Sequence, residues 1–332
     1  LLSEMIHNPD VNRDLQDRGV RFIMDTKGNQ LIPWEELSPA DVIVVPAFGT
    51  TVEIQGKLAE IGIDAYQYDT TCPFVEKVWN RAAQIGQKEY TVVVHGKPTH
   101  EETRATFSHS KEGAPTVVVK NMEQARRLAT YITGGSTPGQ FYEEFKGQHS
   151  DNFDPERDLQ RIGVVNQTTM LASDTQGIAD YLKQVMIRHY QLTPEQVDDH
   201  SANTRDTLCY ATNDNQDATY ALLQQPADLA IIAGGYNSSN TSHLVELCES
   251  KLPTYFISSA DKILDRGLIR HFDLHHKEEK TTENYLPSHS PATILLTCGA
   301  SCPDAVVEGI LVRLLSFFEG TRPVEEVMES FR

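Results

Sequence analysis

The 332-residue chain is poor in cysteine and in positive charge, and it has no long hydrophobic run. Its five cysteines are an odd number in a long chain, which argues against a disulfide framework. No segment approaches the ~20 apolar residues that a membrane-spanning helix needs. Lysine and arginine together number 29 against 47 acidic residues, so the net charge is −18. A charge this negative argues against nucleic acid or an anionic membrane as the main partner.

The first residues, LLSEMIHNPD, contain neither a Met start nor a targeting segment. They enter in the middle of an expected element, and we therefore expect a fragment whose N-terminus is missing.

Three segments share one pattern, in which an apolar run is followed by a glycine, by small or polar residues and then by a helical pattern. These segments are 41–61, 90–107 and 228–248. Each precedes a second strand candidate, in 62–72, 114–121 and 252–259, and a third kind of strand is expected in 161–170 and 292–304. Short apolar runs between turn residues are typical of parallel strands that are buried on both faces.

Strands that alternate with helical patterns predict an α/β fold with small parallel sheets, and the recurrence predicts three similar lobes. We expect a first lobe at 1–72 that is truncated at its N-terminus, a second at 73–207 and a third at 208–332 with a C-terminal helix and tail. An apolar stripe from Val306 to Leu315 predicts that helix. Residues 134–160 break the pattern and are expected to form an ordered insertion loop.

Two cysteines occupy similar turns. Cys72 and Cys209 each follow Asp-Thr-x and precede a helical pattern. A helix N-terminus favours the thiolate form, which suits a metal ligand, although two half-buried structural cysteines are an equal alternative. Two thiolates are too few for a cubane cluster, which usually takes three or four. Cys248 is expected in the core. Cys298 and Cys302 lack the usual zinc-knuckle spacing, and a metal contact by them is left open.

The stretch VVVHGKPTHEE places His95, His100, Glu101 and Glu102 after an apolar run. Zinc is poorly supported, because Arg104 stands where an H-E-x-x-H motif needs its second histidine. His100 and Glu102 instead suit an anion donor beside a proton donor, and an ordinary solvated loop is the alternative. The turns NSSN (237–240), QTTM (167–170) and GAS (299–301) predict an anion site at helix N-termini, with simple N-capping as the alternative.

Seven short motifs occur in a specific order along the chain: HNP (7–9), DTTCP (69–73), HGKPTHEE (95–102), NQTTM (166–170), DTLCYAT (206–212), NSSN (237–240) and GAS-x-PD (299–304). With this ordered set, the sequence resembles the 4-hydroxy-3-methylbut-2-enyl diphosphate reductase family over essentially the whole chain. The likeness is greatest to the plant and cyanobacterial branch, which carries PAFG where other bacteria carry a histidine. Phe48 takes that place here, so one diphosphate donor of the other branch is absent.

The resemblance implies a pseudo-threefold trefoil of three lobes around a central 4Fe–4S cluster that is held by three cysteines. Cys72 and Cys209 match two of them, and the third would lie upstream of residue 1. We therefore expect that the fragment neither assembles a normal cluster nor has activity.

The resemblance also implies two-electron reductive dehydroxylation of the substrate to isopentenyl and dimethylallyl diphosphate, the last step of the methylerythritol phosphate route to isoprenoids. Glu102 would be the proton source and Thr168 would orient the hydroxyl. The expected substrate-binding residues are His7, His100, Thr169, Ser238, Ser239, Asn240 and Ser301. Electrons would come from a ferredoxin or a flavodoxin-type donor.

Two alternatives remain from the residues alone: a zinc-dependent hydrolase that uses His95, His100 and Glu102, and a non-catalytic iron–sulfur binding protein. The expected location is the bacterial cytoplasm or the plastid stroma, and the expected state is a monomer or a homodimer.

Overall fold

The computed structural model describes residues 1–202, 207, 209–289 and 291–329. The chain divides into two compact units, which are described separately. Unit 1 comprises Leu1–Ile6 and Asp10–Asn213, and unit 2 comprises His7–Pro9 and Asp214–Arg332. The division into lobes at 1–72, 73–207 and 208–332 stays a prediction.

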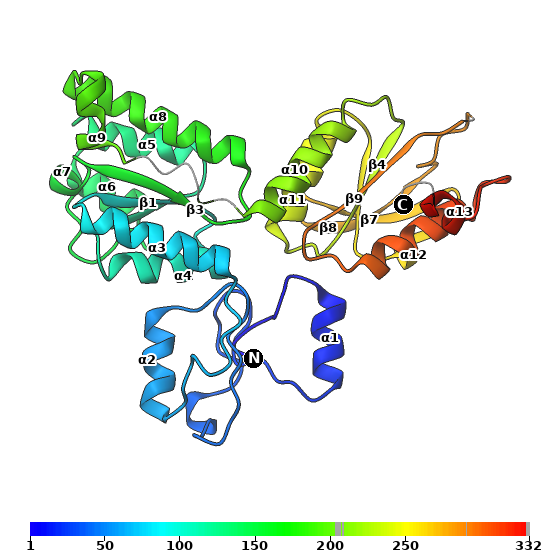
Figure 1. The fold of residues 1–332 in the computed structure, drawn as a ribbon, viewed down its shortest axis with the longest axis horizontal. Coiled ribbons are helices and arrows are strands. Elements are labelled where there is room, and N and C mark those ends of the chain that lie inside the picture. Colours follow the sequence, from blue (N-terminus) through cyan, green and yellow to red (C-terminus); the bar gives the residue numbers. More distant parts are fainter. Residues whose placement is uncertain (203–206, 208, 290, 330–332) are drawn as a thin grey trace. The chain divides into compact units, whose positions relative to one another are not determined.

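Unit 1 contains a three-stranded parallel sheet in the order β2-β1-β3. Its strands are β1 (Thr91–His95), β2 (Thr116–Val119) and β3 (Ile162–Asn166). Helices cover both faces of the sheet (Figure 1); they are α3 (Pro73–Gln87), α4 (Glu101–Lys111), α5 (Met122–Ile132) and α8 (Ala172–Tyr190). Val92 and Val94 pack in one apolar cluster and Val93 in another, and all three are fully buried. The predicted two-sided burial of this run is therefore confirmed.

Residues 134–160 are ordered, as expected, but they are not a simple loop. They contain α6 (Pro138–Glu144) and α7 (Pro155–Asp158). The ring of Phe141 stacks on Phe145 at 5.0 Å and on Phe153 at 5.1 Å between centroids. These buried rings join the core beneath α5 and α8, which fixes the segment.

The first part of unit 1 contradicts two expectations, because neither the apolar run near Val45 nor the candidate in 62–72 forms a strand. Its described elements are α1 (Pro9–Asp17), the 3-10 helix η1 (Trp34–Glu36) and α2 (Val52–Ile61). Val45 makes only a single parallel bridge with Asp69. Pro46 follows and has no N–H to donate, so the ladder cannot continue on that side. Ile43 and Val45 of this run are nevertheless buried, in a cluster with Leu58 of α2.

Unit 2 contains a six-stranded sheet in the order β6-β7-β5-β4-β9, with β8 paired to β7. The strands are β4 (Leu229–Ala233), β5 (Thr254–Ile257), β6 (Ile263–Asp265), β7 (Leu268–Asp273), β8 (Glu278–Glu283) and β9 (Ile294–Cys298). The parallel triple β5-β4-β9 repeats the arrangement β2-β1-β3, because the first strand is central in both. This topology confirms the repeat between the two units.

The predicted parallel strands of unit 2 are extended by three antiparallel strands that were not predicted from the sequence, namely β6, β7 and β8. The sequence of β8, EEKTTE, is almost entirely exposed and gives no hydrophobic signal. Its pairing with β7 extends over six residue pairs, so backbone hydrogen bonds rather than burial define this strand.

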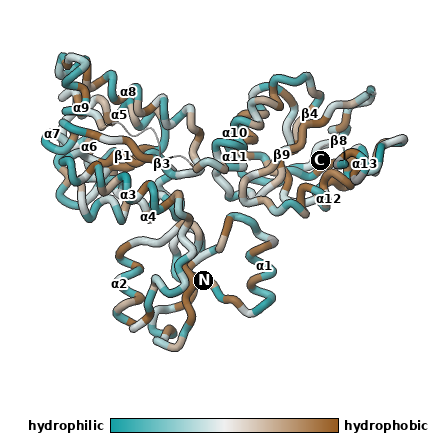
Figure 2. The backbone as a smooth tube through the Cα atoms, viewed as in Figure 1, coloured by the Kyte–Doolittle hydropathy of each residue, from teal (hydrophilic) through white to brown (hydrophobic). Residues whose placement is uncertain are grey.

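Three of the remaining described elements follow predicted helical patterns, namely α10 (Tyr210–Leu222), α11 (Ser239–Glu249) and α12 (Asp304–Leu315). The others are η2 (Pro194–Gln196), α9 (Val197–His200), η3 (Ala260–Lys262) and α13 (Val324–Glu329), which were not predicted from the sequence. α12 confirms the C-terminal stripe, with Ile310 and Leu314 buried. Figure 2 shows hydrophobic residues concentrated in the central strands. Among the described helices, none has both the length and the apolar character needed to cross a membrane.

We expect Phe141→Ala to lower the free energy of unfolding by about 3–5 kcal/mol, because it empties a fully buried ring site between two stacked rings. Urea unfolding followed by circular dichroism measures this change. Tyr66→Ala is the control, since the Tyr66 side chain is exposed, and it should change stability by less than about 1 kcal/mol. Equal midpoints for the two variants would contradict the packing described.

Candidate active site

Glu102 lies at the N-terminus of α4, just beyond the end of β1, and it is 1% exposed. Its carboxylate accepts two hydrogen bonds from Thr168, one from the backbone N–H at 2.5 Å and one from the hydroxyl at 3.0 Å. Thr168 follows the end of β3. Because β1 and β3 are parallel neighbours, their carboxyl ends meet at one edge of the sheet, where α/β proteins commonly bind ligands.

Burial raises the pKa of the Glu102 carboxyl from 4.5 to about 7, and the two hydrogen bonds from Thr168 oppose this shift. Near pH 7 a large fraction of the carboxyl is therefore protonated. A carboxylic acid in this state can donate a proton to a reacting group.

Gln167 stabilises the same edge of the sheet, although it was predicted only as a member of a polar turn. Its amide oxygen accepts hydrogen bonds from the Thr103 hydroxyl at 3.0 Å and from the Lys97 N–H at 3.1 Å. Its amide nitrogen donates to the hydroxyl of Thr169 at 2.7 Å. Gln167 thus joins the loop after β1 to the turn after β3 and fixes Thr169.

His100 is the N-cap of α4, and its Nδ1 accepts a hydrogen bond from the Glu102 N–H at 3.2 Å. The ring proton of neutral His100 consequently lies on Nε2, which can donate to an anion. Phe48 packs against the imidazole edge to face, with 5.7 Å between ring centroids. The aromatic residue that replaces a histidine donor therefore supports the orientation of His100.

One ring nitrogen of His95 already has a protein partner, which counts against the zinc hypothesis. Its Nδ1 shares a hydrogen bond with the Thr175 hydroxyl at 2.9 Å, and the residue is buried. Within the part of the chain that the structure describes, no group of three or more His, Cys, Asp or Glu residues could hold a metal ion.

Cys72 and Cys209 both lie in unit 1 immediately before helices, as predicted. Cys72 is the N-cap of α3 and Cys209 precedes α10, and both are partly exposed free thiols. The ring of Phe74, in the first turn of α3, lies 5.0 Å from the ring of Tyr210, the first residue of α10. The two helix N-termini are therefore close together, which fits two thiolate ligands for one group. Asp206 and Leu208 of the second motif lie outside the described residues.

In unit 2, close backbone approaches bring the HNP, NSSN and GAS segments together. A Cβ at Gly235 would lie 1.9 Å from the carbonyl oxygen of His7, and a Cβ at Gly299 would lie 1.9 Å from Oγ1 of Thr241. Thr241 is fully buried, and its hydroxyl donates to the Ser238 hydroxyl at 3.0 Å. The sequence did not identify Thr241, because only the tertiary structure shows that it links two turns.

Of the three polar turns, only NSSN caps a helix directly. Ser238 is the N-cap of α11 and accepts a hydrogen bond from the Thr241 N–H at 3.3 Å. QTTM and GAS instead precede their helices, whose N-caps are Leu171 and Pro303. Asn240 is 3% exposed, and its side-chain nitrogen and oxygen are both buried without a hydrogen-bond partner. A ligand in this turn would satisfy that amide.

The predicted site residues are divided between the two units. Unit 1 holds Cys72, His100, Glu102, Thr168, Thr169 and Cys209, and unit 2 holds His7, Ser238, Ser239, Asn240 and Ser301. Within each unit these residues come from the segments that follow parallel strands, apart from His7, Cys72 and Cys209.

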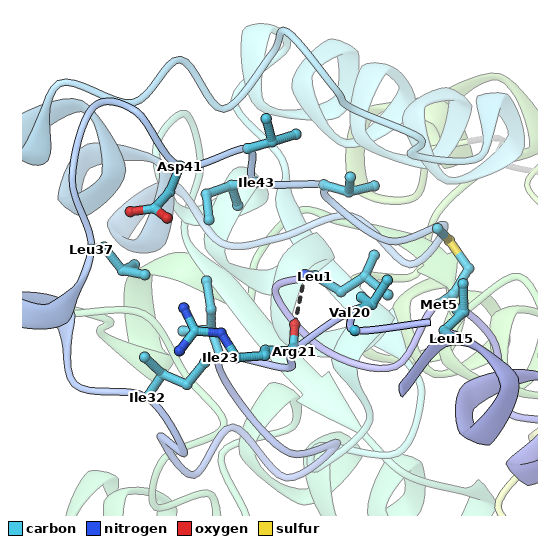
Figure 3. A pocket seen from close by; sticks show the side chains of 13 residues that line it. Leu1, Met5, Leu15, Val20, Arg21, Ile23, Ile32, Leu37, Asp41 and Ile43 are labelled. Atoms are coloured by element: carbon cyan, nitrogen blue, oxygen red, sulfur yellow. Dashed lines mark hydrogen bonds between the residues drawn. The ribbon is translucent and has the colours of Figure 1, made fainter. Parts of the chain in front are cut away.

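A cavity of about 420 Å³ in unit 1 is not part of this site (Figure 3). Its lining is mostly apolar, with Arg21 and Asp41 as the charged side chains, and it includes none of the predicted site residues. The backbone carbonyl of Arg21 accepts a hydrogen bond from the amino group of Leu1 at 2.9 Å.

The raised pKa of Glu102 predicts that stability falls as pH increases. The unfolded state loses this proton near pH 4.5 and the folded state near pH 7, so the stabilisation present below pH 4.5 is lost as pH rises through 7. The loss from this group is about 3 kcal/mol. We expect Glu102→Gln to remove it, whereas the exposed carboxyl of Glu112 should leave the slope unchanged in Glu112→Gln. Urea unfolding at pH 4.5 and pH 8 measures this effect, and parallel pH profiles for wild type and Glu102→Gln would contradict it.

We expect Gly299→Ala to lower the free energy of unfolding by about 1–3 kcal/mol, because the new methyl group overlaps the Thr241 side chain. Gly309→Ala is a matched control, since its added Cβ meets no atom closer than 3.8 Å. Thermal and urea unfolding of both variants test this contact. If the two substitutions have the same effect, the contact between the turns does not constrain the fold.

Comparison with known proteins agrees with these features. Residues 1–315 match the family model described as LytB protein. Relatives named 4-hydroxy-3-methylbut-2-enyl diphosphate reductase include one from Gloeobacter violaceus, 39% identical over 95% of this chain and 74% of that protein, and one from a Synechococcus species, 40% identical over 95% and 76%.

The solved structure of the E-1-hydroxy-2-methyl-but-2-enyl-4-diphosphate reductase from Plasmodium falciparum has a TM-score of 0.64 at 19% identity, and the match covers 94% of this chain and 77% of that one. A second solved structure, titled (E)-4-hydroxy-3-methyl-but-2-enyl diphosphate reductase, the terminal enzyme of the non-mevalonate pathway, has a TM-score of 0.50 at 21% identity, with coverages of 94% and 86%. These likenesses confirm the predicted α/β fold class. From the family match and the identity to these relatives, the chain belongs to the LytB protein family.

Proposed function

We propose that the chain is a 4-hydroxy-3-methylbut-2-enyl diphosphate reductase, an oxidoreductase that forms isopentenyl and dimethylallyl diphosphate at the end of the non-mevalonate route. The family and its named relatives support this activity. The observation that carries it is the buried Glu102 carboxyl, which is held by Thr168 and titrates near pH 7.

The reaction needs a proton donor in a dry site. Two electrons and two protons are consumed, the allylic C–O bond breaks, one proton leaves with the hydroxyl as water, and the other is added to carbon. Glu102 supplies the proton for the leaving hydroxyl, because burial keeps its carboxyl partly protonated at neutral pH. The Thr168 hydroxyl, 3.0 Å from that carboxylate, orients the substrate hydroxyl towards it.

Neutral donors bind the diphosphate. His100 can donate from Nε2, and Ser238 can donate its own hydroxyl proton because its oxygen already accepts from Thr241. The unpartnered amide of Asn240 adds a further donor. His7, Thr169, Ser239 and Ser301 complete the proposed set. Fixed neutral donors stabilise an anion well where water is excluded.

Cys72 and Cys209 would hold the 4Fe–4S cluster implied by the family resemblance, and their position at two neighbouring helix N-termini fits this role. When bound, such a cluster supplies the electrons and a Lewis-acid iron. We propose a ferredoxin or flavodoxin-type protein as the electron source. The proposal also includes a third cysteine ligand for the cluster and a monomeric or homodimeric state. The proposed location is the bacterial cytoplasm or the plastid stroma.

The alternatives have less support. A zinc-dependent hydrolase would need His95, His100 and Glu102 to converge, but His95 contacts Thr175 and the Glu102 carboxylate contacts Thr168. A non-catalytic iron–sulfur protein would have no use for a buried carboxylic acid that titrates near pH 7, and the named relatives are reductases.

Reductase assays of the full-length protein, purified anaerobically, test the proposal. We expect Glu102→Gln to lower kcat by about 10²–10⁴-fold, because glutamine cannot transfer a proton. The iron content and the visible absorbance of the cluster should stay unchanged. Wild-type activity should also decrease as pH rises above 7, since Glu102 then loses its proton.

Glu112→Gln is the matched control, because it removes an exposed carboxyl at the other end of the same helix. We expect wild-type turnover from this control. Full activity of Glu102→Gln with its cluster intact would remove Glu102 from its role, whereas zinc without iron in the purified protein would refute the reductase assignment.

A further inference from the structure

Two cysteines in unit 2 have no part in the proposed reaction. Cys298 is the last residue of β9, and Cys302 follows four residues later. The turn between them is closed by a hydrogen bond from the Cys302 N–H to the Gly299 carbonyl at 2.9 Å. Both side chains pack in the apolar cluster that includes α12. Both are free thiols, with Cys298 partly exposed and Cys302 buried.

The thiols interact with each other. Hydrogen bonding from Cys302 lowers the pKa of Cys298 to about 7, although burial and the charge of Asp304 oppose this shift. The same bond, together with burial, raises the pKa of Cys302. The Cys302 sulfur also lies 3.8 Å from the Pro303 carbonyl oxygen. Cys298 is the more exposed of the two cysteines, so its sulfur is the one that a small-molecule disulfide can reach.

This arrangement is that of an attacking thiol and a resolving thiol. A thiolate attacks disulfides and a neighbouring thiol completes the exchange. We propose that Cys298 and Cys302 form a reversible intramolecular disulfide by exchange with a small-molecule disulfide such as glutathione disulfide, and that this bond weakens diphosphate binding at the GAS turn.

The steps balance without a further oxidant. The Cys298 thiolate attacks one sulfur of glutathione disulfide and displaces a glutathione thiolate, which leaves a mixed disulfide on Cys298. The negative charge on Cys298 is thereby lost, so the interaction that kept the proton on Cys302 disappears. Cys302 then gives its proton to the departing glutathione as its sulfur bonds to Cys298. Two thiols are oxidised and one glutathione disulfide is reduced to two glutathiones.

The consequence for binding follows from the position of the pair and rests on the proposed function. Ser301, a proposed diphosphate donor, lies between the two cysteines, and Gly299 packs directly on Thr241. A disulfide requires the sulfurs to be about 2.05 Å apart, so the turn between them must tighten. Because Gly299 has no space against Thr241, the tightening displaces Ser301 from its reduced position.

Mass spectrometry of the full-length protein tests the disulfide independently of any activity. Both cysteines fall in one tryptic peptide, residues 281–313. After treatment with glutathione disulfide at pH 7, this peptide should be lighter by two hydrogen atoms and should resist alkylation until dithiothreitol is added. Cys248 is an internal control, because it is 1% exposed and its pKa is raised to about 11. An unchanged mass for the 281–313 peptide would overturn the proposal.

Variants and pyrophosphate binding complete the test. We expect Cys302→Ser to retain a stable glutathione adduct on Cys298, and Cys298→Ser to form neither the adduct nor the disulfide.

By calorimetry, the oxidised wild type should bind inorganic pyrophosphate about tenfold more weakly than the reduced form, and Cys298→Ser should not respond to glutathione disulfide. Equal binding by the oxidised and reduced wild type would overturn the effect on the site. If even the reduced protein fails to bind pyrophosphate, the proposed function fails, while the peptide mass still decides whether the disulfide forms.

Discussion

The carboxyl group of Glu102 is buried and accepts two hydrogen bonds from Thr168, and this contact joins the loop after β1 to the turn after β3. An ionised carboxylate in this position is costly, because burial outweighs the stabilisation that the two bonds provide. The chain therefore keeps an acid in its candidate site at neutral pH. Gln167 and His100 fix the same loops, so the position of the acid depends on a connected set of polar contacts.

In unit 2 polar turns also come together, but through close backbone contacts rather than through a hydrogen-bonded carboxyl group. Its turns meet through backbone approaches that leave no room for a side chain at Gly235 or Gly299. The parallel triple of strands is the same as in unit 1, and the polar turns again follow the central strand and its outer neighbour. A common strand arrangement thus places a hydrogen-bonded acid in one unit and, in the other, the turn that we propose to bind an anion.

The negative net charge of the chain does not indicate which groups we propose to bind the anionic ligand. The chain carries a net charge of −18, yet the proposed diphosphate donors are hydroxyl, amide and imidazole groups. Neutral donors can be buried at far lower cost than arginine or lysine, and they retain their strength where water is absent. The negative net charge therefore does not argue against the anionic ligand that we propose.

The sequence alone predicted the α/β class, the buried strands β1, β2, β3, β4, β5 and β9 and the helix α12, because apolar runs and helical stripes are local signals. The family resemblance supplied the roles proposed for Glu102, Thr168 and the two cysteines. Local signals failed near Val45, where only a single bridge forms because Pro46 cannot donate a backbone hydrogen bond. They also failed for β8, whose exposed polar residues form a strand only by pairing with β7.

Only the tertiary structure decided which polar residues meet. The hydrogen bonds of Glu102 with Thr168, the approach of Gly299 to Thr241 and the contact between Phe48 and His100 join residues that are far apart in the chain. Such contacts depend on the order of the strands and on the space between the turns. Neither can be predicted from a short segment of sequence. The sequence therefore determined which residue types are present at the strand ends, and the folded chain determined the burial that raises the pKa of Glu102, because burial requires the surrounding elements to be in place.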